Sequence, residues 1–167
     1  KYPMIGMSSE RLKFGVYDVV QNKTIYLNIT DFTDERYLTN PAWSPDSKTI
    51  YIQVMNREQK ELNLNAYDAI TGEYMATLLT EKNDKFLEPN KPLVFLDDDR
   101  FIYTTDNRDG YYNLYLYSLK KKQLTRLTRV DADVEYLDHD NKYVYYYSAE
   151  VSPAERHLCR VNIATGK

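Results

Sequence analysis

One pattern occurs three times along the chain: a strand-like run, a tight polar turn, a returning strand-like run and a second polar turn. The outgoing runs are 49–54, 100–105 and 142–148, and the returning runs are 61–67, 112–117 and 156–163. Shorter apolar runs flank these pairs at 38–43, 92–96, 134–137, 74–79 and 124–128. Taking Tyr51, Tyr103 and Tyr145 as equivalent, and likewise Tyr67, Tyr117 and Val161, the unit recurs about every 40 to 50 residues. Four-stranded units of that period predict the blades of a β-propeller.

The pattern predicts an all-β fold, a partial β-propeller of about three to four blades of four-stranded antiparallel sheet. The whole of 1–167 is then a fragment of one propeller domain, with both end blades incomplete. The predicted parts are an outer hairpin of a preceding blade (1–33), two blades (34–81 and 82–129) and an incomplete blade (130–167). The polar stretch 82–89 is interpreted as the crossover between two blades.

Composition agrees with a sheet protein and excludes several function classes. The 167 residues include 17 Tyr, whose rings pack well on a pleated, half-buried surface. The net charge is −3 with acidic and basic residues interleaved, whereas nucleic-acid binders gather a basic excess. No apolar stretch approaches the roughly 20 residues of a membrane span. We therefore expect no nucleic-acid partner and no membrane span in this segment.

The residues that most often carry chemistry are few and dispersed. His139 lies at a predicted hairpin tip beside two aspartates, and His157 lies in a predicted strand. The acidic run 97–99 lacks the spacing of a calcium loop, and the single cysteine, Cys159, cannot form an internal disulfide. No Gly-x-Ser-x-Gly elbow and no Gly-rich phosphate loop occurs. We predict no catalytic residue, no metal site and no cofactor in this segment.

Several motifs, in this order along the chain, resemble the propeller region of the dipeptidyl peptidase IV family. They are Tyr2-Pro3 with Gly6, Ala42-Trp43 before a turn, the strand and Asn-Arg-x-Gln turn of 51–59, the Tyr-Asp-x-x-Thr-Gly turn of 67–72, and the acidic-Gly-Tyr hairpin of 106–111 with the strand 114–117. The resemblance covers nearly the whole chain. It implies that the parent is a serine exopeptidase of the prolyl oligopeptidase clan, which removes dipeptides with Pro or Ala in second position.

The resemblance also implies where the parent's chemistry lies. The catalytic triad belongs to a C-terminal α/β-hydrolase domain beyond Lys167, and the glutamates that bind the substrate's amino terminus lie upstream of Lys1. This chain would be inactive alone and would gate and orient peptide substrates. The C-terminal domain and the peptide are the expected partners, and a periplasmic or secreted location is expected.

One element of the family's substrate contacts has a counterpart in this chain. In relatives, the loop before an inner strand brings an aromatic side chain and an arginine towards the substrate. Here Phe86 is the candidate substrate-binding aromatic, whereas Leu87 and Glu88 stand where the arginine is expected. Packing inside the fold is the alternative role for Phe86.

Two other functions fit a propeller. A TolB-like or WD40-like propeller would act as a protein-binding module, and some carbohydrate-active propellers catalyse through their own loops. The latter predicts a cluster of His and carboxylates, which two dispersed histidines do not supply. The unpaired edges of the blades are also expected to promote self-association, because edge strands are templates for pairing.

Overall fold

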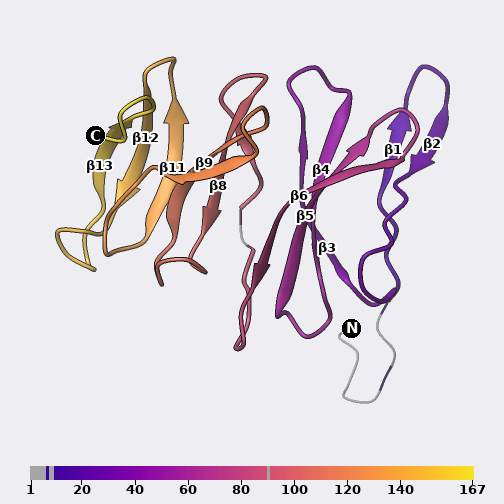
Figure 1. Ribbon diagram of the computed structural model, residues 1–167, viewed down its shortest axis with the longest axis horizontal. Coiled ribbons are helices and arrows are strands. Elements are labelled where there is room, and N and C mark those ends of the chain that lie inside the picture. The colour runs from indigo at the N-terminus through magenta and orange to yellow at the C-terminus, as the bar shows by residue number, and fades with distance from the viewer. Residues whose placement is uncertain (1–6, 8–9, 90) are drawn as a thin grey trace. The chain divides into compact units, whose positions relative to one another are not determined.

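The computed structural model describes residue 7, residues 10–89 and residues 91–167. Its thirteen strands are β1 (Gly15–Asp18), β2 (Lys23–Tyr26), β3 (Tyr37–Trp43), β4 (Thr49–Met55), β5 (Glu61–Asp68), β6 (Tyr74–Lys82), β7 (Val94–Phe95), β8 (Arg100–Thr105), β9 (Asn113–Ser118), β10 (Gln123–Arg126), β11 (Val134–His139), β12 (Tyr143–Ser148) and β13 (His157–Asn162). Figure 1 shows them in chain order. The Tyr2-Pro3 and Gly6 motif lies outside the described residues.

The strands form four antiparallel sheets, and within each sheet consecutive strands pair. The sheets are β1-β2, β3-β4-β5-β6, β7-β8-β9-β10 and β11-β12-β13. Contacts divide the chain into two units, Lys1–Pro89 and Asn90–Lys167, each with two of the sheets. Small sheets of two to four antiparallel strands confirm the predicted all-β, partial-propeller fold. The division into blades at 33, 81 and 129 stays a prediction.

The register of the sheets tests the equivalences proposed from sequence. One predicted set of equivalent residues is Tyr67, Tyr117 and Val161. In the sheets these residues pair with Ile50, Phe101 and Val144 on the outgoing strands. The residues that follow these partners are Tyr51, Ile102 and Tyr145. The residue of β8 that corresponds to Tyr51 and Tyr145 is therefore Ile102, and the prediction of Tyr103 is wrong by one residue. A slip of one residue moves a side chain to the other face of the sheet, and β8 carries its tyrosine on the other face.

Alternation along the central strands builds the core of each unit. In the first unit Ile50, Ile52 and Val54 share one face of β4 and pack with Leu27 and Ile29, which follow the β1–β2 hairpin. In the second unit, Ile102, Leu114, Val144 and Val161 belong to one buried cluster. Each such side chain contributes about 1.5–3 kcal/mol by leaving water. The long central strands are thus held by burial on both faces.

Two predicted glycine turns have the backbone they require. Gly72 has φ +78° and Gly110 has φ +80°, a region that glycine adopts without a Cβ penalty. Gly72 also lies against the β1–β2 hairpin, since its carbonyl accepts a hydrogen bond from Asn28 N at 2.8 Å. A Cβ built at Gly72 would stand 2.3 Å from the Tyr26 carbonyl oxygen. This glycine therefore joins two sheets of the first unit.

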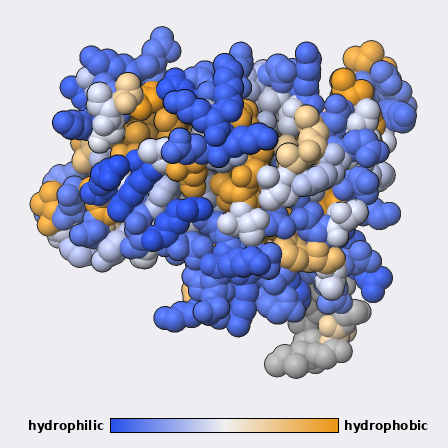
Figure 2. Space-filling view, in the orientation of Figure 1, coloured by the Kyte–Doolittle hydropathy of each residue, from blue (hydrophilic) through white to orange (hydrophobic). Residues whose placement is uncertain are grey.

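The surface is mostly hydrophilic on the face shown in Figure 2. Hydrophobic residues are exposed at the tip of the β1–β2 hairpin, where Val19 and Val20 are 79% and 91% exposed. Among the described residues, no helix is long and apolar enough to cross a membrane.

Candidate functional site

The segment that holds the candidate Phe86 runs from 83 to 89, between β6 and β7, and has no strand of its own. Two backbone hydrogen bonds fix it to the turn between β4 and β5. Asn83 N donates to the Lys60 carbonyl at 2.9 Å, and Leu87 N donates to the Gln59 carbonyl at 2.6 Å. The Asn-Arg-x-Gln turn found in the sequence therefore supports this segment directly.

Leu87 anchors the segment by burial. Its side chain is 3% exposed and packs with Met55 and Leu62, with Tyr37 alongside. Those three residues form a row across the end of the sheet, because Tyr37 pairs with Met55 and Met55 pairs with Leu62. The start of β3, the end of β4 and the start of β5 thus make one apolar floor under Leu87.

Asn40 fixes the far end of the segment. It lies at a register shift in β3 with φ +50°, a left-handed conformation that asparagine tolerates. Its Nδ2 donates to the Gln53 Oε1 at 3.0 Å and to the Pro89 carbonyl at 3.1 Å. The bulge therefore turns an amide side chain towards the crossover and secures it.

Phe86 is 58% exposed between these anchors. Its neighbour Leu87 is the buried residue of the segment. An exposed aromatic ring on a segment secured at both ends has a defined place in which to meet a ligand. A contact between Phe86 and substrate stays a prediction, and so does the alternative that Phe86 has a packing role.

An arginine does lie near this segment, although not at the positions expected. Glu88 is exposed and Leu87 is buried, but Arg57 of the β4–β5 turn lies over the Tyr37 ring, 5.2 Å from its centroid. An Arg57 Nη1–H also donates to the Tyr37 hydroxyl. Cation–π contact and hydrogen bond together orient the guanidinium. The Asn-Arg motif was visible in the sequence, but its contact with Tyr37 depends on the pairing of β3 with β4.

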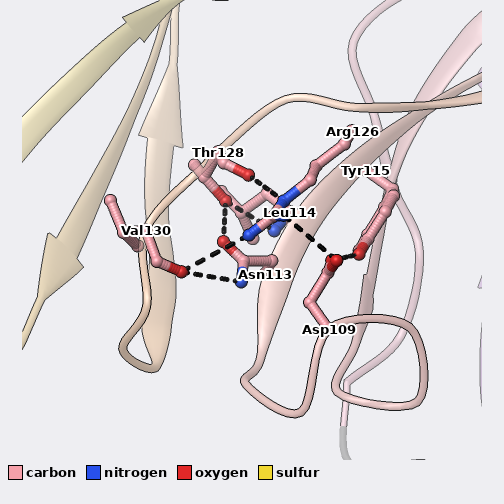
Figure 3. Close-up of polar contacts among 7 residues, drawn as sticks. All are labelled: Asp109, Asn113, Leu114, Tyr115, Arg126, Thr128 and Val130. Atoms are coloured by element: carbon pink, nitrogen blue, oxygen red, sulfur yellow. Dashed lines mark hydrogen bonds and ion pairs between the residues drawn. The ribbon is translucent and has the colours of Figure 1, made fainter.

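The second unit has a polar network at the corresponding loops, shown in Figure 3. Arg126 Nη1 lies 3.0 Å from Asp109 Oδ1, and both side chains are 26% exposed. The Tyr115 hydroxyl donates to the other oxygen of Asp109. Arg126 also donates from Nε to the Thr128 carbonyl at 2.8 Å and from Nη2 to the Val130 carbonyl at 3.4 Å. This guanidinium therefore ties the β8–β9 hairpin to the β10–β11 crossover.

Asn113 completes that network from the interior. It is fully buried, and its Nδ2 donates to the Val130 carbonyl at 3.2 Å. Thr128 donates its hydroxyl to Asn113 Oδ1 at 2.8 Å and accepts the Leu114 N–H at 2.9 Å. The crossover after β10 is thus held by buried hydrogen bonds, which rigidify a loop because leaving any of them unmade is costly.

The other sequence candidates are dispersed. His139 Nδ1 lies 2.7 Å from the Tyr136 hydroxyl, and His157 Nε2 lies 2.7 Å from Glu155 Oε2. Burial raises the pKa of Asp97, but hydrogen bonds from Arg100 and from backbone N–H groups outweigh it and leave that pKa below its usual value. Cys159 is half-buried in β13. Across the described part of the chain, no three His, Cys, Asp or Glu side chains gather closely enough to hold a metal ion.

Comparison with known proteins gives one consistent family. A putative dipeptidyl aminopeptidase IV from Bacteroides ovatus superposes with a TM-score of 0.90 and 34% identity, over 100% of this chain and 26% of that one. Porphyromonas gingivalis dipeptidyl peptidase 4 gives 0.85 at 22% identity, over 100% of this chain and 24% of that one. TolB from Acinetobacter baumannii gives 0.63 at 19% identity, over 93% of this chain and 36% of that one, a likeness of fold.

Curated sequences agree. A probable dipeptidyl-aminopeptidase B from Aspergillus clavatus is 26% identical over 98% of this chain, and one from Tuber melanosporum is 27% identical over 98%. The chain spans about 20% of the length of these relatives. The family described as the dipeptidyl peptidase IV (DPP IV) N-terminal region matches residues 1–167. The chain therefore belongs to the dipeptidyl peptidase IV N-terminal region family.

Proposed function

We propose that this chain is a non-catalytic propeller segment of a dipeptidyl peptidase IV-like serine exopeptidase, which gates and orients peptide substrates for a C-terminal hydrolase domain of the same parent chain. The observation that carries the proposal is the family match over all 167 residues combined with the 20% share of the curated relatives. A periplasmic or secreted location is part of the proposal.

The contacts of the first unit support an orienting role. Phe86 is an exposed ring on an anchored segment, and Arg57 is an exposed cation held against Tyr37. A flat apolar ring and a guanidinium are suited to an extended peptide, because one packs on side chains and the other donates to carbonyl or carboxylate oxygens. Rigid support keeps both in place without help from the ligand.

The test uses the full-length protein that contains this chain. We expect it to hydrolyse Gly-Pro and Ala-Pro chromogenic substrates, and we expect Phe86→Ala to lower kcat/KM about tenfold by removing one apolar contact. Met75→Ala is the matched control, since Met75 is 56% exposed on the strand β6. Residues 1–167 alone should give no turnover.

Three results would contradict the proposal. The first is a full-length protein without activity on any substrate that has Pro or Ala in second position, which would favour a TolB-like protein-binding module. The second is turnover by residues 1–167 alone, which would place the chemistry in the propeller itself. The third is equal kinetics for Phe86→Ala and the unchanged protein, which would contradict the part of the proposal that gives Phe86 a contact with substrate.

A further inference from the structure

A hollow of about 200 Å³ opens in the second unit, among the loops that join β8 to β9 and β12 to β13 and the connections that lead into β7 and β11. The residues that matter for its chemistry are Lys91, Tyr112, Asp133, Glu135, Tyr147 and Arg156. None of them belongs to the segment 83–89 or to the network of Figure 3.

The wall of the hollow is fixed before any ligand arrives. Tyr112 N donates to Asp133 Oδ1 at 2.8 Å, and Val134 N donates to the Tyr112 carbonyl at 2.8 Å. The crossover that leads to Asp133 is the one that Asn113 and Arg126 hold. Figure 3 shows that network. A ligand that enters would therefore order little of this wall, which favours affinity.

The charges of the hollow are not equivalent. Glu135 is paired with Lys91, with Oε1 and Nζ 3.3 Å apart, and one oxygen of Asp133 is occupied by the Tyr112 N–H. Arg156 is exposed, and its hydrogen bond is to the neighbouring Glu155 carbonyl at 3.3 Å. Among the described residues it makes no ion pair with a carboxylate. Arg156 is thus the cation of the hollow whose guanidinium N–H groups can bind a ligand.

We propose that this hollow binds a carboxylate of a peptide through Arg156, with the rings of Tyr112 and Tyr147 as its aromatic walls. A planar guanidinium matches a carboxylate with two parallel hydrogen bonds, and phenol rings offer flat apolar surface to the rest of the residue. The inference rests on the proposed function, because it assigns the hollow to the parent's peptide substrates. It goes beyond that function in giving the propeller a preference for acidic peptides.

The carboxylate can be that of an acidic side chain or that of the peptide's C-terminus, and four peptides distinguish the two. Each begins Gly-Pro, carries either Glu or Gln in its tail, and ends in either a free acid or an amide. In the full-length protein we expect Arg156→Gln to lower kcat/KM about tenfold for peptides with the recognised carboxylate, the loss expected for one charged hydrogen-bonded contact. Peptides without it should be unaffected, and added salt should shrink the difference.

Arg129→Gln is the matched control, because Arg129 is exposed in the same unit and the substitution removes the same charge. It should leave all four peptides unchanged. If Arg156→Gln and Arg129→Gln behave alike while the protein hydrolyses Gly-Pro peptides, the inference is wrong and the proposed function stands. Titration calorimetry with the same peptides measures their binding even if the protein does not hydrolyse them. Selective binding that Arg156→Gln abolishes, in a protein without hydrolysis, would sustain the hollow and overturn the proposed function.

Discussion

Two asparagines occupy matching positions in the two four-stranded sheets and make similar bonds. Asn63 accepts from the Thr80 hydroxyl at 2.7 Å and donates to Asp31 Oδ2 at 2.8 Å. Asn113 accepts from Thr128 at 2.8 Å and donates to the Val130 carbonyl at 3.2 Å. Asn63 joins the outer strand β6 to the connection between β2 and β3, whereas both partners of Asn113 lie in the connection between β10 and β11. Asn113 is the fully buried one of the two, and removing its amide leaves its partners unpaired, at a cost of about 1–3 kcal/mol for each group.

At Tyr67 a single side chain should make the free energy of unfolding depend on pH. It is fully buried, and burial, with Asp31 nearby, raises the pKa of its phenol to about 12. In the unfolded chain the phenol titrates near its ordinary value of about 10. Its contribution to stability is therefore complete below pH 10 and is lost as the pH rises towards 12. The free energy of unfolding, measured by urea titration from pH 8 to 12, should fall less steeply in Tyr67→Phe than in the unchanged protein.

The control for Tyr67 is Tyr26→Phe, at a position that is 61% exposed. It should reproduce the unchanged protein's pH profile. An unaltered slope in Tyr67→Phe would show that the phenol does not contribute to alkaline unfolding.

At the scale of elements, strands and turns were predictable because their signals are local. The runs 49–54 and 100–105 lie within β4 and β8, since alternation and turn residues mark them in the sequence itself. The assignment of Tyr103 failed because both aromatic residues of β8, Phe101 and Tyr103, lie on one face, and Ile102 takes the place that tyrosine has in β4 and β12. The burial of Leu87 could not be predicted, because it depends on Met55 and Leu62, which only the folded sheet brings near.

The candidate site was likewise predictable only where its signal is local in the sequence. The crossover and its aromatic residue followed from the sequence and the family resemblance. The contact between Arg57 and Tyr37 and the hollow beside Arg156 did not, because each joins residues from different strands or loops.

The glycine turns offer a matched pair of substitutions. Ala at Gly72 and Ala at Gly110 carry the same backbone penalty, about 1 kcal/mol, because both positions have positive φ. Only Gly72 adds a clash, since its Cβ would meet the Tyr26 carbonyl at 2.3 Å, whereas a Cβ at Gly110 meets nothing within 4 Å. Gly72→Ala should therefore lower the urea midpoint clearly more than Gly110→Ala. Equal urea midpoints for the two variants would show that the β1–β2 hairpin moves away from the added Cβ without a loss of stability.

At the scale of the whole molecule, open sheets leave strand edges for pairing. β1 and β13 are both at the edge of their sheets, and the β1–β2 tip exposes Val19 and Val20. Such edges and apolar tips favour association between copies.

We therefore expect residues 1–167 in isolation to self-associate. Sedimentation velocity should show a mean mass that rises with concentration, and Val19→Lys with Val20→Lys should reduce the effect if the tip contributes. A monomer at every concentration would contradict this expectation.

Pairing between consecutive strands has a consequence for synthesis of the chain. In the sheet β3-β4-β5-β6 each strand bonds to the one made just before it. Its hydrogen bonds can all form once Lys82 has left the ribosome, before any residue of the next sheet is needed. Contacts of short sequence separation form quickly, because little loop entropy opposes them. The nascent chain can therefore complete its strand pairing sheet by sheet, whereas Ile102 and Leu114 are buried only after Val144 and Val161 of the next sheet have been made. An apolar face is exposed to misfolding during that interval.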